Sequence, residues 1–202
     1  MTDSAVNSSR IGRTRRARAF RSYALVAVAI GAVTGGALLL MGRVPICRCG
    51  YVKAWHGVVF SAENSQHLSD WYTFSHVIHG FLFYGLLWLV ARSRPAGWRL
   101  VAATLIECVW ELFENTDFVI GRYREVTIAL DYYGDSVINS LSDVAAMAAG
   151  FALASRLRAR TVVLIALALE LFVGFAIRDN LTLNIIMLLY PVDAIKEWQA
   201  GG

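Results

Sequence analysis

Residues 72–91 read YTFSHVIHGFLFYGLLWLVA and form a nearly continuous apolar run. About 20 such residues are enough for a helix to cross the roughly 30 Å hydrocarbon core of a bilayer. The run contains no Asp, Glu, Lys or Arg, but His76 and His79 lie in its first half. This stretch predicts a membrane span and raises the question of what its two histidines face.

The composition of the whole chain is that of a membrane protein. Its 202 residues are enough for one compact domain. Hydrophobic residues make up 57% of the chain, against about 45–50% in soluble domains. Charged residues make up only 17%, against about 25%, and the mean hydropathy is +0.52. These values favour a small polytopic membrane protein over a soluble enzyme with one anchor.

The positive charge of the chain is distributed as membrane topology requires. The net charge is +4, but six arginines lie within the first 21 residues, directly before an apolar run. Lys and Arg concentrated in short segments beside spans set orientation, whereas a nucleic-acid reader carries a basic patch on its folded surface. We therefore expect no nucleic-acid partner.

The apolar runs predict an all-α bundle with about five transmembrane helices. The first run is too long for a typical signal-peptide core and is followed by no A-x-A cleavage site, so we interpret it as an uncleaved span. Residues 1–21 are predicted to be a disordered basic cytoplasmic tail, and residues 22–202 a single membrane domain. The predicted spans are residues 23–41, 72–91, 100–117, 135–155 and 161–177.

The arginine distribution predicts an N-terminus in the cytoplasm and a C-terminus outside. In that orientation the arginine-rich segments 1–21, 92–99 and 156–160 all lie in the cytoplasm. The polar loop 43–70 and the C-terminal segment 178–202 are then outside. The latter includes LTLNIIMLLY, which is too short to cross alone, so it is interfacial, re-entrant or packed over the bundle. Residues 118–134 are predicted to be a connecting loop.

Polar residues within the predicted spans share helical faces. Glu107, Glu111 and Glu114 have i, i+4, i+7 spacing and fall within roughly a 60° arc. His76 and His79 are i, i+3 neighbours. On the fourth span, a second set falls within roughly an 80° arc: Asp135, Asn139 and Asp143. With a rise of about 1.5 Å per residue, the two histidines, Glu111, Glu114, Asn139 and Asp143 lie roughly 4–12 Å below the outer membrane face, and Glu107 lies deeper. The sequence thus predicts one polar pocket in the outer half of the bilayer.

This pocket holds more carboxylates than cations. A charge at the centre of a span costs about 2.5–3.5 kcal/mol on insertion scales, so the groups must pair, become neutral or bind an ion. Two histidines, one carboxylate and an open position make a catalytic zinc site. We predict one divalent metal such as zinc, with His76, His79 and Glu111 as ligands. Glu114 or Asp143 is the candidate general base, and Asp135 and Asn139 complete the candidate catalytic set. A structural hydrogen-bond network is the alternative.

The outer loop is a second candidate site. Its residues are Cys47, Cys49, His56 and His67. Two cysteines separated by one residue are too close for an easy disulfide. A metal site, loop packing and redox pairing all remain open for this loop. Cys108 lies in an apolar run and is predicted to be a packed thiol.

Several strings resemble a family of small bacterial inner-membrane proteins of unknown function. The resemblance extends from about Met41 to Trp198 and implies a multi-pass protein of the cytoplasmic membrane with a five-span-like layout, but no established activity. The strings are CRCG (47–50), SAENSQHLSDWYTFSHVIHG (61–80), ECVWELFEN (107–115), LDYYGDSVINSLSD (130–143) and RDNLTLNIIM (178–187).

A weaker similarity extends to the VanZ-like membrane proteins, which are associated with glycopeptide-antibiotic resistance. Their pattern of a His, an E-x-x-Q, an Arg and a D-x-x-x-N is similar to His76 or His79, Glu111-x-x-Glu114, Arg124 and Asp135-x-x-x-Asn139. Glu114 replaces the Gln, and the acids at 107 and 143 and the C-x-C loop are departures. The similarity supports the assignment of these residues to one site, but it does not indicate a particular reaction.

Three functions remain open from the sequence. The first is a metal-assisted hydrolase or transferase that acts on an envelope lipid or lipid-linked precursor. The second is a non-catalytic binder of a lipid or glycan precursor. The third is a proton-coupled carrier, because intramembrane His, Glu and Asp residues relay protons, with Glu170 extending the path. The expected partners are membrane lipids and an amphiphilic or lipid-linked ligand.

Overall fold

The computed structural model describes residues 3–127 and 131–201, and within these ranges the chain forms eight helices and no strands. The long segment 41–72 between the first two helices is irregular. The helices are α1 (Asp3–Leu40), α2 (Thr73–Ala91), α3 (Ala96–Glu114), α4 (Asp117–Val126), α5 (Val137–Ala154), α6 (Ala159–Ile177), α7 (Leu181–Leu189) and α8 (Asp193–Gln199).

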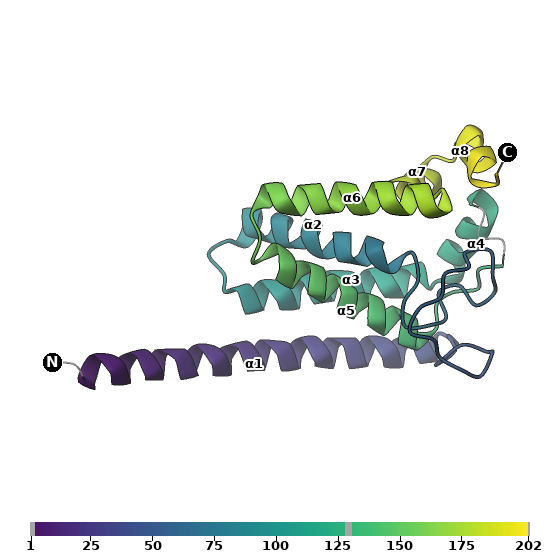
Figure 1. The fold of residues 1–202 in the computed structure, drawn as a ribbon. Coiled ribbons are helices and arrows are strands. Elements are labelled where there is room, and N and C mark those ends of the chain that lie inside the picture. Colours follow the sequence, from purple (N-terminus) through teal and green to yellow (C-terminus); the bar gives the residue numbers. More distant parts are fainter. Residues whose placement is uncertain (1–2, 128–130, 202) are drawn as a thin grey trace.

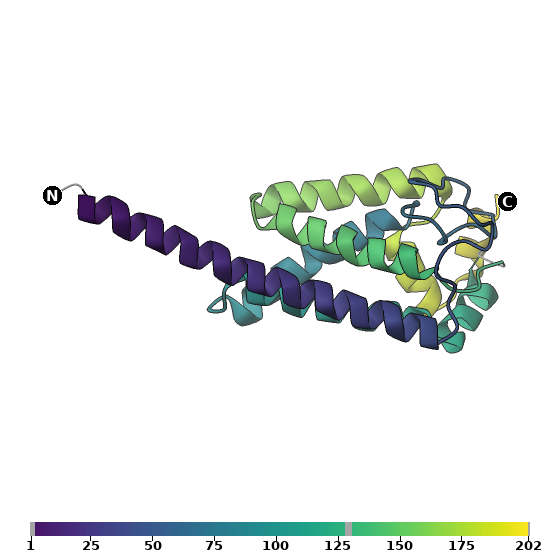
Figure 2. The same ribbon diagram turned by 90° about the horizontal axis from the view of Figure 1, so that it is seen from below.

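The five longest helices run alternately up and down a bundle, with α2, α3 and α5 between α1 and α6 (Figure 1). The long loop 41–72, α4, α7 and α8 all gather at one end, which we name the loop end. The short turns after α2 and α5 lie at the opposite end, beyond which α1 projects toward its N-terminus (Figure 2). The predicted polar sets therefore all come from helix segments near the loop end.

Four of the described helices are long and apolar enough to cross a membrane: Arg21–Leu40 within α1, α2, α5 and α6. Half of the α5 span is buried inside the protein, but only 6% of the α6 span is. Apolar side chains of α6 such as Leu171 and Phe175 are 75% and 91% exposed. An exposed apolar surface of this extent suits lipid rather than water, so the helices indicate a membrane-inserted protein.

The predicted span 100–117 corresponds to α3, which does not meet the same standard of apolarity. It has 19 residues, the length of a span, but it carries Arg99, Glu107, Glu111 and Glu114. The structure thus gives four apolar candidate spans among the described residues instead of five. Glu107 and Glu111 are fully buried, so the charges that lower the apolarity of α3 face the inside of the bundle.

Two segments predicted to be irregular contain helix. Helix α1 begins at Asp3 and passes through the predicted disordered tail, whose alanines and arginines favour helix. Helix α4 occupies part of the predicted loop 118–134, and Thr116 caps its N-terminus by accepting from Val119 N. Residues 128–130 of that loop lie outside the described residues. The C-terminal segment forms α7 and α8.

Helices α2 and α5 pack with their backbones in close approach because two glycines lie at their crossing. A Cβ atom on Gly80 would lie 2.1 Å from the Met147 carbonyl oxygen, and one on Gly150 would lie 2.2 Å from the Val77 carbonyl oxygen. Small residues commonly allow such close packing of membrane helices. Since His79 directly precedes Gly80, this crossing brings the α2 histidines next to α5.

The half of the bundle away from the loop end contains an apolar cluster. Leu87, Ala103, Met147 and Phe151 form a buried cluster that joins α2, α3 and α5. Leu87 lies eight residues beyond His79 on α2, which is about 12 Å along the helix. The polar residues of the loop end are therefore separated from the opposite end by packed hydrocarbon side chains.

Candidate functional site

The histidines of α2 meet the buried carboxylate of Glu107. The Nδ1 atom of His76 lies 2.6 Å from Oε1 of Glu107. The Nδ1 atom of His79 lies 3.2 Å from the same oxygen and 3.1 Å from Oε2. An ionised carboxylate only accepts hydrogen bonds, so both rings donate to it through Nδ1–H. Glu107 therefore fixes the tautomer of both histidines.

This tautomer leaves the second nitrogen of each ring available as a ligand. Neither Nε2 atom has a hydrogen-bond partner among the described residues. The Nε2 atom of His76 lies 3.8 Å from Oδ2 of Asp143 on α5, and the other oxygen of Asp143 accepts from the Thr73 hydroxyl at 3.1 Å. Histidines that bind a metal generally donate their other N–H to a carboxylate, as these two do.

Glu111 differs from Glu107 because it has no hydrogen-bond donor. It is fully buried, and neither of its carboxylate oxygens has a hydrogen-bond partner within residues 3–127 and 131–201. Its partner in the ion pairs is His76, whose Nδ1 lies 3.5 Å from Glu111 Oε1, but this ring is a cation only when its Nε2 is protonated as well. A buried carboxylate in this position must be neutralised by a proton or by a nearby cation.

A cavity of about 80 Å³ lies beside these groups at the loop end. Six residues predicted for the site, from α2, α3 and α5 or the segment before it, line the cavity, whereas Glu107 and Glu111 do not. Trp110 and the α7 residues Leu181, Ile185 and Leu188 form an apolar part of the wall. The polar lining includes His76, His79, Glu114, Asp135, Asn139 and Asp143.

Helices α7 and α8 are held over the cavity by one buried acid, Asp179. Its carboxylate accepts from the Tyr72 hydroxyl at 3.0 Å, the Asn184 amide at 2.9 Å and the Gln199 amide at 3.0 Å. Burial raises the pKa of Asp179 to about 6. Glu170 of α6 accepts from the backbone N–H groups of Leu181 and Thr182, so it caps α7 and does not extend the cluster.

Two of the predicted catalytic residues have positioning contacts. The amide of Asn139 donates to the His67 carbonyl oxygen at 2.9 Å, which ties the long loop to α5. Asp135 accepts from the Asn115 amide at 3.0 Å and from the Tyr132 hydroxyl at 3.0 Å. Asn115 in turn accepts from the Asp135 backbone N–H at 2.7 Å. These contacts hold the C-terminus of α3 against the start of α5.

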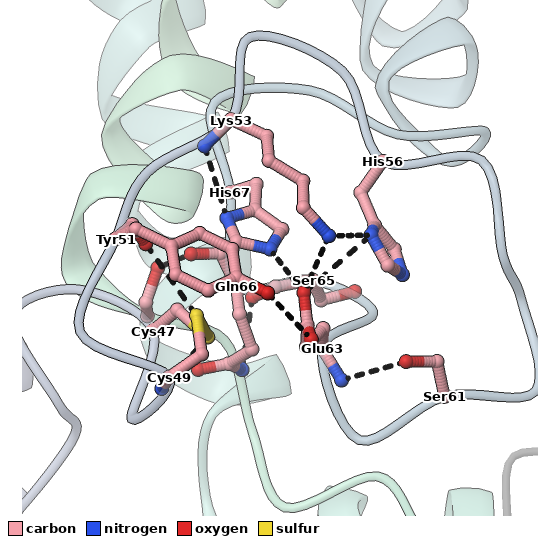
Figure 3. The surroundings of a disulfide bond; sticks show 11 residues. Cys47, Cys49, Tyr51, Lys53, His56, Ser61, Glu63, Ser65, Gln66 and His67 are labelled. Carbon is pink, nitrogen blue, oxygen red and sulfur yellow. Dashed lines mark hydrogen bonds and ion pairs between the residues drawn. A yellow bond between two sulfur atoms is a disulfide. The ribbon is translucent and has the colours of Figure 1, made fainter.

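The histidines of the outer loop belong to a separate cluster, which Figure 3 shows. Its centre is Glu63, which accepts from Lys53 Nζ at 2.6 Å, His67 Nε2 at 3.0 Å and the Tyr51 hydroxyl at 2.9 Å. These hydrogen bonds, that of Lys53 first, lower the pKa of Glu63 to about 2. Burial, followed by the charge of Lys53, lowers the pKa of His56.

The hydrogen bonds of His67 oppose a role as a metal ligand in this arrangement. Its Nδ1 accepts from the Lys53 backbone N–H at 3.2 Å, so the proton is on Nε2, which donates to Glu63. Binding a cation through Nε2 would move the proton to Nδ1, where it would face another donor. Both ring nitrogens of His67 are therefore used within the loop, whereas the buried Nε2 of His56 has no hydrogen-bond partner among the described residues.

The C-x-C spacing argues against an easy disulfide, but the structure joins Cys47 and Cys49 in one, so pairing is the outcome among the alternatives that the sequence left open. Their Cα atoms are 5.1 Å apart, inside the usual range for this bond. A turn in which Gly50, with φ of +85°, donates to the Cys47 carbonyl oxygen brings them together. Cys108 is free and buried, as predicted.

Within the described part of the chain, three groups of side chains could hold a metal ion, because their ligand atoms lie within 4.8 Å of one another. They are Cys47, Cys49, Glu63 and His67; His76, His79 and Glu107; and His76, Glu111 and Glu114. The first group cannot bind through its sulfurs while the disulfide is intact. In the second, the 2.6 Å contact between His76 and Glu107 leaves no room for an ion between them. The available ligand positions are those on the cavity side.

Sequence reasoning missed the part of the cavity that comes from α4 and the C-terminal segment, notably Tyr123 and Asp179. It also did not assign Glu107 its role between the histidines. Trp110, Asn115 and Asp179 lie inside the strings ECVWELFEN and RDNLTLNIIM, so those strings held a signal. Arg124 lies apart from the cluster and lines a second cavity.

Comparison with known proteins identifies relatives but no described activity. Residues 38–201 match the profile of a protein of unknown function (DUF2585). The chain is 64% identical over 162 residues to a UPF0314 protein of Sinorhizobium fredii, which covers 80% of this chain and 82% of the relative. It is 53% identical over 194 residues to a UPF0314 protein of Paracoccus denitrificans, which covers 96% and 98%. No solved structure matches the chain. The chain therefore belongs to the DUF2585 family of bacterial proteins, whose members carry the name UPF0314.

Proposed function

We propose that the protein is a five-span protein of the bacterial cytoplasmic membrane, with its N-terminus inside and the loop end outside. The alternating direction of the helices supports a crossing by α3, since its charged residues lie inward. The arginine-rich turns 92–95 and 155–158 lie at the end opposite the cavity, as the positive-inside rule requires for cytoplasmic segments. In this topology the cavity opens near the outer membrane surface.

We infer that the cavity is the site of a metal-dependent hydrolase or transferase. The observation that carries this proposal is the pair of histidines that donate through Nδ1 to Glu107, while neither Nε2 atom has a hydrogen-bond partner among the described residues. The 3.8 Å between His76 Nε2 and Asp143 Oδ2 suits one ion bound by both atoms, because zinc bonds to nitrogen and oxygen are about 2.0–2.2 Å long. Among the groups of described residues whose ligand atoms lie within 4.8 Å of one another, none combines His79 with both His76 and Asp143, so the His79 ring would have to move to become the third ligand.

Glu114 has the position expected of a general base. It lines the cavity with the ligand side chains, and its carboxylate accepts from the Tyr123 hydroxyl at 2.9 Å. A metal-bound water loses its proton near neutral pH, and a carboxylate at the same cavity can receive it. In this scheme Glu107 orients the ligands and Glu111 remains behind them as a proton-bearing acid. These roles revise the ligand set that the sequence predicts.

The cavity lining favours an amphiphilic substrate. One part of the wall carries the acids and histidines, and another part carries Trp110 and the α7 leucines and isoleucine. An envelope lipid or a lipid-linked precursor has a polar group beside a hydrocarbon chain and suits both parts. Membrane lipids are therefore the proposed partners of this site.

Zinc content of the purified protein tests this proposal. We expect about one equivalent in wild type, and its loss in His76→Ala and Asp143→Asn. His56→Ala is the matched control, because it removes a buried histidine of the loop cluster and leaves zinc bound. Folded wild-type protein that retains no zinc after loading and dialysis would contradict the metal site.

A metal-free result would favour the second candidate, a non-catalytic binder of a lipid or glycan precursor. The same two-part cavity supports it, as does the similarity to VanZ-like proteins at His76, Glu111, Arg124 and Asp135. Binding of a lipid extract without conversion, measured by mass spectrometry, would separate a binder from an enzyme. The proton-coupled carrier has least support, because Glu170 caps α7 and the Leu87 cluster closes the other half of the bundle.

A further inference from the structure

A second cavity, of about 320 Å³, lies at the loop end between the C-terminus of α1, α4 and the segment before α5. Its lining contains three arginines, Arg43, Arg48 and Arg124, together with two carboxylates, Asp117 and Asp135. We propose that this arginine pocket binds a phosphate group. The proposal is independent of the metal chemistry proposed for the first cavity.

The three guanidinium groups are held around one short stretch of backbone. Arg43 Nη1 donates to the Tyr133 carbonyl oxygen at 2.9 Å, and Arg124 Nε donates to the Tyr132 carbonyl oxygen. The guanidinium of Arg48 lies over the Tyr133 ring, 4.7 Å from its centroid. Arg48 and Arg124 are thus oriented by uncharged partners, which leaves their positive charges available, whereas Arg43 also pairs with Asp117. Arginines arranged in this way suit the several oxygens of a phosphate.

The carboxylates of the pocket do not neutralise these arginines fully. Asp117 pairs with Arg43 at 3.2 Å, but its side chain is 95% exposed. Asp135 directs its oxygens to Tyr132 and Asn115. Among the ion pairs of the described ranges, none includes Arg48 or Arg124. An anion that enters the pocket therefore meets two arginines without carboxylate partners.

The backbone leaves room for such an anion. Gly42 and Gly121 both line the pocket, and a Cβ atom on either would have no neighbour within 4 Å. Arg43 follows the last residue of α1 by only three positions, so the pocket lies where the apolar span Arg21–Leu40 ends. Lipid head groups lie at that level of a membrane. The phosphate group would therefore come from an anionic lipid or from a free phosphate compound.

Binding measurements in neutral detergent test the pocket with two probes, inorganic diphosphate and short-chain phosphatidic acid. We expect Arg48→Gln and Arg124→Gln each to weaken binding about tenfold or more, because a charge-assisted hydrogen bond contributes roughly 1.5–3 kcal/mol. Arg156→Gln is the control: it removes the same charge from the turn after α5, at the opposite end of the bundle. Gly121→Leu keeps the charge and fills the space, so it should also weaken binding.

The two probes distinguish the sources of the phosphate group. Tight binding of phosphatidic acid alone indicates a lipid head group, and tight binding of diphosphate alone indicates a free compound. Binding of neither probe, or equal affinities in wild type, Arg48→Gln and Arg156→Gln, would overturn the proposal. The metal site is tested separately, since His76→Ala should leave the affinity for both probes unchanged. Thermal unfolding of each variant confirms that it is folded.

Discussion

The protein contains two clusters of similar composition and different character, each built from one glutamate and two histidines. In the loop, Glu63 receives hydrogen bonds from Lys53, His67 and Tyr51. In the bundle, Glu107 receives hydrogen bonds from His76 and His79. Additional carboxylates surround the bundle cluster, and none of the ion pairs among the described residues brings a lysine or arginine to it.

The loop cluster and the bundle cluster both contain a glutamate and two histidines, so residue types alone do not identify a ligand site. In the loop cluster, the ammonium group of Lys53 neutralises Glu63, and His67 uses both of its ring nitrogens. In the bundle cluster, both histidines retain one nitrogen, and Glu111 has no donor. The unsatisfied acceptors, rather than the histidines themselves, distinguish a candidate binding site from a structural network.

Removing the central glutamate should affect the two clusters very differently. Glu107→Ala leaves two buried Nδ1–H donors without an acceptor, so we expect a loss of about 3–5 kcal/mol of unfolding free energy. Glu63→Ala should cost less, because its cluster is partly exposed to water. Equilibrium unfolding in mixed micelles measures both. Equal losses in the two variants would contradict the contrast between the clusters.

The glycine crossing offers a way to disturb the bundle cluster without changing its chemistry. Gly80→Ala places a methyl group 2.1 Å from the Met147 carbonyl oxygen, so α2 must move away from α5. We expect a cost of about 1–3 kcal/mol and weaker binding of zinc. Gly85→Ala on the same helix is the control, since its Cβ would have no neighbour within 4 Å. If both variants unfold at the same denaturant concentration, the crossing does not position the histidines.

Much of this comparison could be anticipated from sequence, because helical periodicity and equal depth bring His76, Glu114, Asn139 and Asp143 to one region. The role of each residue within the cluster could not be anticipated from the sequence. Whether Glu107 or Glu111 contacts the histidines depends on the crossing of α2 and α3, which is set by side-chain packing rather than by the spacing of the acids.

The sequence also does not predict how α7 and α8 are held over the cavity or how the loop is folded. The apolar string of α7 does not show how Asp179 holds it over the site, because only Asn184 is near Asp179 in the sequence, whereas Tyr72 and Gln199 come from distant segments. The pairing of the C-x-C cysteines was left open because a turn at Gly50, invisible in the spacing alone, brings the two cysteines within reach of each other. The periodicity of a sequence shows which residues share a helix face, but it does not show which residues of different segments contact each other.

Substitution of Glu111 tests whether its carboxylate lacks a partner, in contrast to that of Glu63. Glu111→Gln keeps the shape and removes the capacity to ionise, so we expect unchanged or increased stability, by up to about 1 kcal/mol, in metal-free protein. The matched Glu63→Gln should instead destabilise the loop, because its charge is fully paired. Both effects can be read from thermal unfolding in detergent after chelation of metal. A large loss of stability in Glu111→Gln would show that its carboxylate has a partner in solution.

The stability of the folded loop should depend on pH, and we expect this effect to be smaller than those above. The pKa of Glu63 is lowered to about 2 from an ordinary value of 4.5, so the folded loop prefers the ionised form. Its contribution is therefore complete above about pH 4.5 and is lost as the pH falls from there toward 2. Pepsin, which is active over this range, should cleave between Tyr51 and His67 increasingly as the pH falls, after normalisation to an unfolded peptide. In Glu63→Gln the normalised cleavage should be high at every pH in this range. If the wild-type loop remains equally resistant to pepsin from pH 5 to pH 2, the disulfide and the contacts to α5 hold it without the Glu63 network. The loop cluster and the bundle cluster would then differ only in the charges of their residues.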